Sequence, residues 1–120
     1  MLASNTQPAA SASPGSLAIV MAGPPPHYVP ANDTARASGL TFFVSNTSPA
    51  GHTIAIGRGP IVFDTFDSVT TPPLAVSGLV LPGTSATFTV NGLAPGTYVF
   101  WCTIGDHASL GMVGTLTVNP

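Results

Sequence analysis

The chain has 120 residues, of which 44% are apolar, and this is enough for one domain with a hydrophobic core. Only two arginines and four aspartates carry charge, and the formal net charge is −2. This composition excludes a nucleic-acid-binding surface, because such surfaces depend on Lys and Arg at phosphates. It also removes the polybasic route to a membrane surface. No run reaches the roughly 20 apolar residues of a membrane span.

The first residues differ in composition from the rest of the chain. Residues 1–15 are mostly Ala, Ser, Pro and polar residues without periodicity, and they predict a flexible tail or linker. We therefore expect one folded domain over 16–120.

The domain sequence predicts short strands and no long helices. Gly and Pro number 13 each, and no segment keeps a 3.6-residue apolar period over two turns. Alternating or short apolar runs predict strands at 17–21, 40–46, 52–56, 60–63, 79–81, 85–90, 97–102 and 112–118. Tyr98, two residues after Gly96 of a Pro-Gly turn, resembles a tyrosine corner or is a core aromatic. This pattern favours an all-β fold, specifically a Greek-key β-sandwich.

The most informative segment is the loop between the last two predicted strands. Cys102, His107 and Met112 have the spacing Cys-x4-His-x4-Met, so a strand, a loop and a strand can aim three side chains at one point. A thiolate, imidazoles and a thioether are the donor set that suits copper. A second imidazole must come from elsewhere, and His52 after a Pro-Ala-Gly turn is a better candidate than His27.

Other interpretations of these residues are weaker. Taken singly, each of the four has an ordinary role as a core or surface residue. Zinc sites use close Cys or His pairs such as C-x2-C, which this chain lacks, and Met is not among their usual ligands. A Cys–His nucleophile pair is disfavoured because Cys102 ends an apolar strand and no further acid, base or oxyanion device is evident. We therefore expect no enzyme.

These segments resemble the cupredoxins of the plastocyanin and azurin type over about 17–118. The ligand-loop spacing is similar to that of the longer-loop members auracyanin, rusticyanin and sulfocyanin, without a choice among them. The resemblance is carried by the segments at 28–30, 37–39, 51–52, 81–84, 94–102 and 111–114.

The resemblance implies a cupredoxin fold and one type 1 (blue) copper ion. Its equatorial ligands would be His52, Cys102 and His107, with Met112 axial. The carbonyl of Gly51 would approach the metal, and Thr53, where many members have Asn or Ser, would help to fix the ligand loop by hydrogen bonds.

The implied function is the transfer of single electrons between a donor and an acceptor protein. These partners would dock transiently at an uncharged apolar patch around the exposed edge of His107, formed by Pro49, Ala50, Ala108, Leu110 and Gly111. Copper storage or delivery, a domain cut from a larger copper enzyme, and a sandwich module that binds no metal remain alternatives. The family further implies a monomer outside the cytoplasm, periplasmic or extracellular, with the N-terminal segment as a candidate linker to a membrane anchor.

Overall fold

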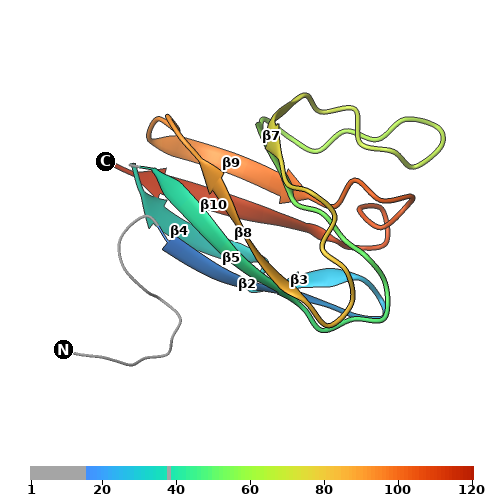
Figure 1. Ribbon diagram of the computed structural model, residues 1–120. Helices are drawn as coiled ribbons and strands as arrows, with labels where there is room; N and C mark the ends of the chain where they lie inside the picture. Colours follow the sequence, from blue (N-terminus) through green and yellow to red (C-terminus); the bar gives the residue numbers. More distant parts are fainter. Residues whose placement is uncertain (1–15, 38) are drawn as a thin grey trace.

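The strands form two layers that face each other. The computed structural model describes residues 16–37 and 39–120, so the predicted tail at 1–15 lies outside the described residues. One sheet has the strand order β4-β10-β9-β6-β7 and the other β3-β2-β5-β8 (Figure 1). Their bounds are Ser16–Ala22 (β2), His27–Val29 (β3), Asn32–Arg36 (β4), Leu40–Asn46 (β5), Ala55–Arg58 (β6), Pro73–Val76 (β7), Ser85–Val90 (β8), Gly96–Trp101 (β9) and Val113–Asn119 (β10).

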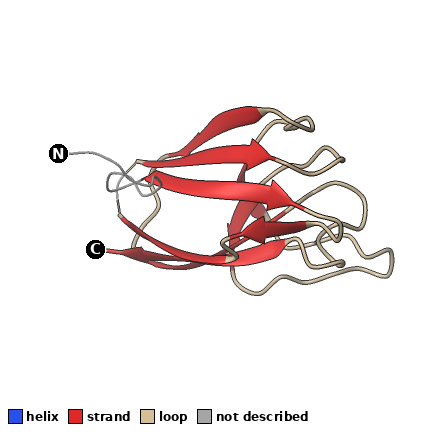
Figure 2. Cartoon of the chain, turned by 90° about the horizontal axis from the view of Figure 1, so that it is seen from below, coloured by secondary structure: helices blue, strands red, loops and turns tan. Residues whose placement is uncertain are grey.

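The expected all-β sandwich is confirmed, and the described residues contain no helix (Figure 2). It follows that none of residues 16–37 and 39–120 belongs to a helix long and apolar enough to cross a membrane. Both sheets are mixed. β2 runs parallel to β5, β4 runs parallel to β10, and the other pairs are antiparallel.

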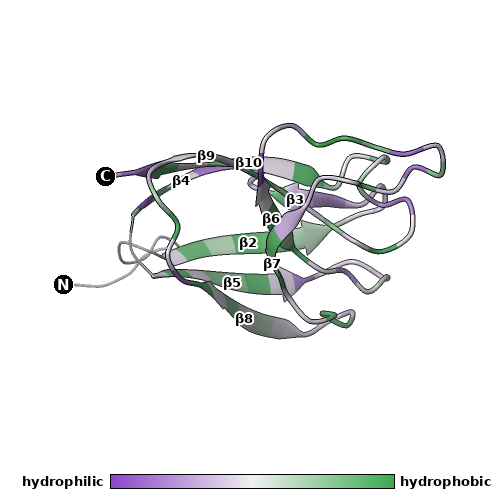
Figure 3. Cartoon of the chain, turned by 90° about the horizontal axis from the view of Figure 1, so that it is seen from above, coloured by the Kyte–Doolittle hydropathy of each residue, from purple (hydrophilic) through white to green (hydrophobic). Residues whose placement is uncertain are grey.

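The core lies between the two sheets because apolar side chains alternate along the central strands. In β5 the buried apolar residues are Leu40, Phe42 and Val44, and β2 and β10 show the same period of two. Figure 3 shows these apolar positions in green along β2 and β5. The hydroxyl of Tyr98 donates to the carbonyl of Ala94 at 2.6 Å, so the predicted tyrosine corner is present.

Phe100 of β9 lies at the centre of this core. Its ring is fully buried, 5.1 Å from the ring of Tyr28 and 6.4 Å from that of Phe42. The residue opposite it in β10 is Gly114, where a β-carbon would meet the Phe100 ring and approach the carbonyl oxygen of Ala31 to 2.5 Å. The large ring thus occupies the space that the glycine leaves.

Several predicted strands are shorter than expected. The expected strand at 52–56 begins only at Ala55, and His52 makes an isolated bridge with Val80. The segments 60–63 and 79–81 form no strands and contribute one bridge residue each, Phe63 and Val80. Each segment lies beside Pro or Gly, which shorten backbone pairing. The structure also contains β3, β4 and β7, which were not predicted.

Candidate metal centre

The register of β9 and β10 brings Cys102 and Met112 together. Trp101 ends β9 opposite Val113, which begins β10, so Cys102 and Met112 face each other just beyond the paired residues. The amide of Cys102 donates to the carbonyl of Met112 at 3.1 Å. Both side chains are buried in the main core cluster, Cys102 at 2% and Met112 at 0% exposure.

The intervening loop folds back on itself and brings His107 close to Cys102. The amide of His107 donates to the carbonyl of Ile104 at 3.0 Å, and the carbonyl of His107 accepts from the amide of Met112 at 3.0 Å. Gly105 and Gly111 adopt positive φ angles of 48° and 121°, which suit glycine better than other residues. The loop is therefore held by its own backbone at both sides of the histidine.

His52 reaches the same point from a distant part of the chain. It follows the turn after β5, and its backbone exchanges two hydrogen bonds with Val80, of 3.2 and 2.8 Å. These bonds fix its position between two segments, and its side chain is 1% exposed. His27, the other candidate, is exposed, and its Nδ1 lies 2.7 Å from the carbonyl of Pro25.

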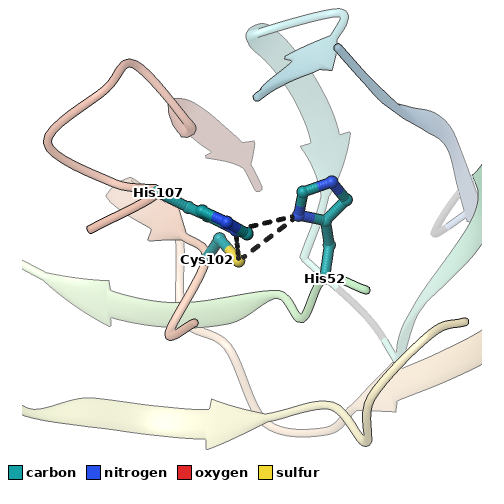
Figure 4. A group of neighbouring side chains, drawn as sticks. All are labelled: His52, Cys102 and His107. Carbon is teal, nitrogen blue, oxygen red and sulfur yellow. Dashed lines mark hydrogen bonds between the residues drawn. The ribbon is translucent and has the colours of Figure 1, made fainter. Parts of the chain in front are cut away.

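Three donor atoms converge in this region (Figure 4). The Nδ1 atoms of His52 and His107 are 3.1 Å apart, and the Sγ of Cys102 lies 3.8 Å from the first and 3.6 Å from the second. First-row metals bind nitrogen and sulfur at about 2.0–2.3 Å, so two donors on one ion lie roughly 3–4.5 Å apart. The residues present thus fit a single ion bound by two imidazoles and a thiolate.

Burial keeps the buried imidazole neutral. The pKa of His52 is lowered from its usual value, first by desolvation and then by the nearby charge of His107 when that ring is protonated. A neutral imidazole is the form that binds a metal. No proton therefore has to leave His52 near neutral pH before it can act as a ligand.

Thr53 ties the two ligand-bearing segments together. Its hydroxyl accepts the amide of Thr103 at 2.8 Å and lies 2.7 Å from the hydroxyl of Thr103 and 3.9 Å from the Sγ of Cys102. The carbonyl of Thr53 accepts the buried hydroxyl of Tyr28 at 2.6 Å. Burial, with a smaller contribution from Cys102, raises the pKa of Tyr28, so that it stays a neutral donor.

We expect Thr53→Val to loosen this connection. Valine has nearly the same shape but cannot accept the amide of Thr103, and an unpaired amide costs about 1–3 kcal/mol. Urea denaturation of the metal-free protein should show this loss in the free energy of unfolding. Thr87→Val, the same change at an exposed site on β8, should stay within about 0.5 kcal/mol of the parent. Equal losses in both variants would contradict the assignment.

Gly51 lies directly before His52, under the side chain of Leu79. A β-carbon at position 51 would approach Leu79 Cδ1 to 3.0 Å, so glycine gives Leu79 room against the ligand-bearing turn. The approach of the Gly51 carbonyl to the metal stays a prediction.

A mostly apolar hollow of about 220 Å³ opens beside the two histidines. His107 is half-buried in it, and Leu110 is 53% exposed at its side. The residues lining it are Gly23, Pro24, Pro26, Ser48, Pro49, Ala50, His52, Asp106, His107 and Leu110. The proline-rich turn before β3 was absent from the predicted patch.

The prediction for Ala108 was wrong. This residue is only 4% exposed and belongs with Trp101 and Ala55 to a second, smaller cluster of buried residues. Its side chain therefore contributes to the interior and not to an exposed apolar patch.

Sequence reasoning also missed Asn46, Ser48 and Tyr28 as neighbours of the site. All three are buried polar side chains, and each forms a hydrogen bond to the segment 48–53. Their spacing in the sequence carries no recognisable signal, apart from the position of Asn46 at the end of β5.

A two-sheet β-sandwich that gathers two imidazoles and one thiolate at one end of its strands has the architecture of a small mononuclear copper protein. The model of the copper-binding proteins of the plastocyanin/azurin family matches residues 23–119. The chain belongs to this family and is a cupredoxin, and its cofactor is a type 1 copper ion.

Known relatives agree with this assignment. Auracyanin-B of Chloroflexus aurantiacus is 40% identical over an alignment of 60 positions, which covers 45% of this chain and 26% of the relative. The chain thus matches about a quarter of that relative's length. The reduced auracyanin of Roseiflexus castenholzii is 27% identical with a TM-score of 0.68, over 91% of this chain and 100% of the other. The rusticyanin of Thiobacillus ferrooxidans shares the fold, with 20% identity and a TM-score of 0.65 over 89% and 79% of the two chains.

Proposed function

We propose that this protein is an electron carrier, which passes single electrons between redox proteins and catalyses no reaction of its own. The observation that carries the proposal is the convergence of His52 Nδ1, Cys102 Sγ and His107 Nδ1 within 3.1–3.8 Å of one another at a largely buried site. When bound, copper supplies a one-electron change between Cu(I) and Cu(II). These three residues would hold the ion, and Met112 would supply a fourth ligand.

The protein framework favours this role because it holds the ligands in place. The backbone bonds between His52 and Val80, and between Cys102 and Met112, anchor three of the four ligands to the sandwich. The bonds of Thr53 to Thr103 connect the two segments. Ligands that move little when the charge of the metal changes keep the reorganisation energy low, and a buried site excludes water.

The partners would approach at the hollow beside His107. Its walls are mainly prolines, alanine and leucine, with one aspartate, so an uncharged and apolar partner surface fits it best. A small apolar contact suits the brief encounters of redox proteins. As in the family, we place the protein outside the cytoplasm as a monomer, with residues 1–15 as a candidate linker to a membrane anchor.

The first experiment is a Cu(II) titration of the full chain, followed by visible spectroscopy. An electron carrier should develop an intense thiolate-to-copper band at one equivalent, lose it on adding ascorbate and regain it with ferricyanide over many cycles. Binding of Cu(I) without colour after oxidation would favour storage or delivery. No specific copper binding would contradict the proposal altogether.

Leu110→Asp tests the docking surface. A carboxylate beside His107 should place like charges opposite each other when two copies meet, and electron self-exchange measured by NMR line broadening should slow by about tenfold or more at low salt. The matched control is Leu74→Asp on β7, where the leucine is 54% exposed outside the hollow. Equal slowing in both variants would show that this hollow is not the docking site.

Met112→Leu tests the fourth ligand. Leu has a similar volume, so the fold should lose less than about 1.5 kcal/mol. Removal of the thioether should weaken Cu(II) binding more than Cu(I) binding, and each tenfold difference raises the reduction potential by about 59 mV. Voltammetry should show a potential raised by at least that amount with the blue colour retained. An unchanged potential would contradict a role for Met112 at the metal.

A further inference from the structure

Three buried polar side chains form a hydrogen-bonded series that ends at the Nε2 of His52. The Oδ1 of Asn46 lies 2.8 Å from the hydroxyl of Ser48, and this hydroxyl lies 2.7 Å from the Nε2 of His52. Asn46, Ser48 and His52 are 1%, 5% and 1% exposed. Figure 4 shows this second nitrogen of His52 on the side of the ring that faces away from Cys102 and His107.

The amide of Asn46 has only one favourable orientation. Its Nδ2 donates to two backbone carbonyls, that of Ala50 at 2.7 Å and that of Val80 at 2.9 Å. A flipped amide would place an oxygen against both carbonyl oxygens. The Oδ1 is therefore the atom that faces Ser48, and it accepts both the amide of Ser48 at 3.0 Å and its hydroxyl.

The hydroxyl of Ser48 has a single proton and two neighbours that can only accept. These are the Oδ1 of Asn46 at 2.8 Å and the carbonyl of Ala50 at 3.0 Å. If the proton pointed to His52 instead, the serine oxygen would face two bare oxygens inside the protein. The proton therefore lies toward one of these oxygens, and the serine oxygen is left to accept, from the amide of Ala50 at 3.3 Å and from His52.

We propose that Asn46 and Ser48 are positioning residues that hold the ring of His52 in the tautomer with hydrogen on Nε2. The Nδ1 lone pair then faces Cys102 and His107 before any metal arrives. The inference rests on the proposed role of His52 as a copper ligand. It adds that the orientation of one amide, six residues earlier in the chain, selects the nitrogen that binds.

The consequence is a site that is ready for metal. A ring with hydrogen on Nδ1 would direct a proton at the other two donors and would have to change tautomer before binding. Loss of an outer partner of a ligating histidine costs about 10- to 100-fold in metal affinity. We expect Ser48→Ala to lower copper affinity by this factor, because the Nε2 hydrogen would lose its buried acceptor.

The direct test is the ring tautomer in the metal-free full chain, read from long-range ¹H–¹⁵N NMR spectra. His52 should show nitrogen shifts of the Nε2-protonated tautomer in the parent protein. It should shift toward a mixture of tautomers in Ser48→Ala. An Nδ1-protonated ring in the parent, or identical shifts in Ser48→Ala, would overturn this proposal. Either result would leave the proposed electron-carrier function untouched.

Affinity measurements separate the hydrogen bond of the Ser48 hydroxyl from the packing of the side chain. Cu(I) competition with a chromogenic chelator should show weaker binding for Ser48→Ala and near-parental binding for Ser48→Thr, which keeps the acceptor oxygen. Ser109→Ala is the matched control, since its exposed hydroxyl donates to the carbonyl of Asp106 at 2.8 Å and to no other group of residues 16–37 and 39–120. Equal losses in the alanine and threonine variants at position 48 would show that packing matters instead, and would also overturn the inference.

Discussion

Cys102→Ala should abolish the blue band and lower copper affinity by more than roughly 100-fold. A loss of up to about that size follows when a ligating histidine loses its hydrogen-bond partner, and here a ligand itself is removed. The thiolate is the only sulfur anion that the chain can offer, since Cys102 is its single cysteine. Without it, two imidazoles and a thioether remain, and no thiolate-to-copper band can form. Visible absorption and Cu(I) competition measure the two effects.

The control for this variant must remove a buried side chain without touching the site. Val118→Ala serves, because Val118 is buried near the opposite end of β10, paired with Gly96. It should lose stability and keep both colour and affinity. A Cys102→Ala protein that still binds one copper with parental affinity would contradict the assignment of the thiolate as a ligand.

Phe100→Ala should have the largest effect on stability. The ring is fully buried between the two sheets, against Tyr28 and Phe42, and opposite Gly114. Truncation of a buried phenylalanine costs about 3–5 kcal/mol, a large part of the 5–15 kcal/mol that stabilises a typical domain. The cavity would persist because the facing residue is a glycine that cannot fill it.

Urea denaturation should be measured on the metal-free protein, because a ligand that binds only the folded state adds its own stabilisation. Phe66→Ala is the matched control. Phe66 is 84% exposed in the segment between β6 and β7, and its loss should change the free energy of unfolding by no more than about 0.5 kcal/mol. A change below about 1 kcal/mol in Phe100→Ala would contradict the central role of this ring.

The sequence predicted β2, β5, β9 and β10 well because burial imposes a period of two on them, and it predicted the edge strand β8 from the alternation of its residues. β5 and β8 have the predicted bounds, and β2, β9 and β10 differ by one residue at either end. By contrast, β4 has the sequence Asn-Asp-Thr-Ala-Arg, with only Ala35 buried. It is an edge strand, and polar and charged residues are common at edges. β7 is also an edge strand, begins with a proline and is largely exposed. Neither of these two strands carries the apolar alternation by which β2, β5, β8, β9 and β10 were found.

Around the metal centre, too, the sequence located some residues correctly and misplaced another. The segment from Cys102 to Met112 could be recognised because its two ends continue into adjacent antiparallel strands. Residues that are close in the sequence therefore bring these two side chains together. His52 was selected over His27 by its position after a turn, and the structure shows it beside the other donors. The outward direction expected of Ala108 was wrong, because a turn decides which way its side chain points.

By itself the sequence determined the fold class, the family and the candidate ligand residues, since strand periodicity and ligand chemistry depend on residue type and short spacing. Tertiary structure alone decided how His52 is presented to the other ligands. Asn46 is oriented by the carbonyl of Val80, 34 residues away in the chain. The bond between Thr53 and Thr103 spans 50 residues. Such hydrogen bonds exist only after the two sheets have packed, because the partners share no local pattern and meet only in the folded chain.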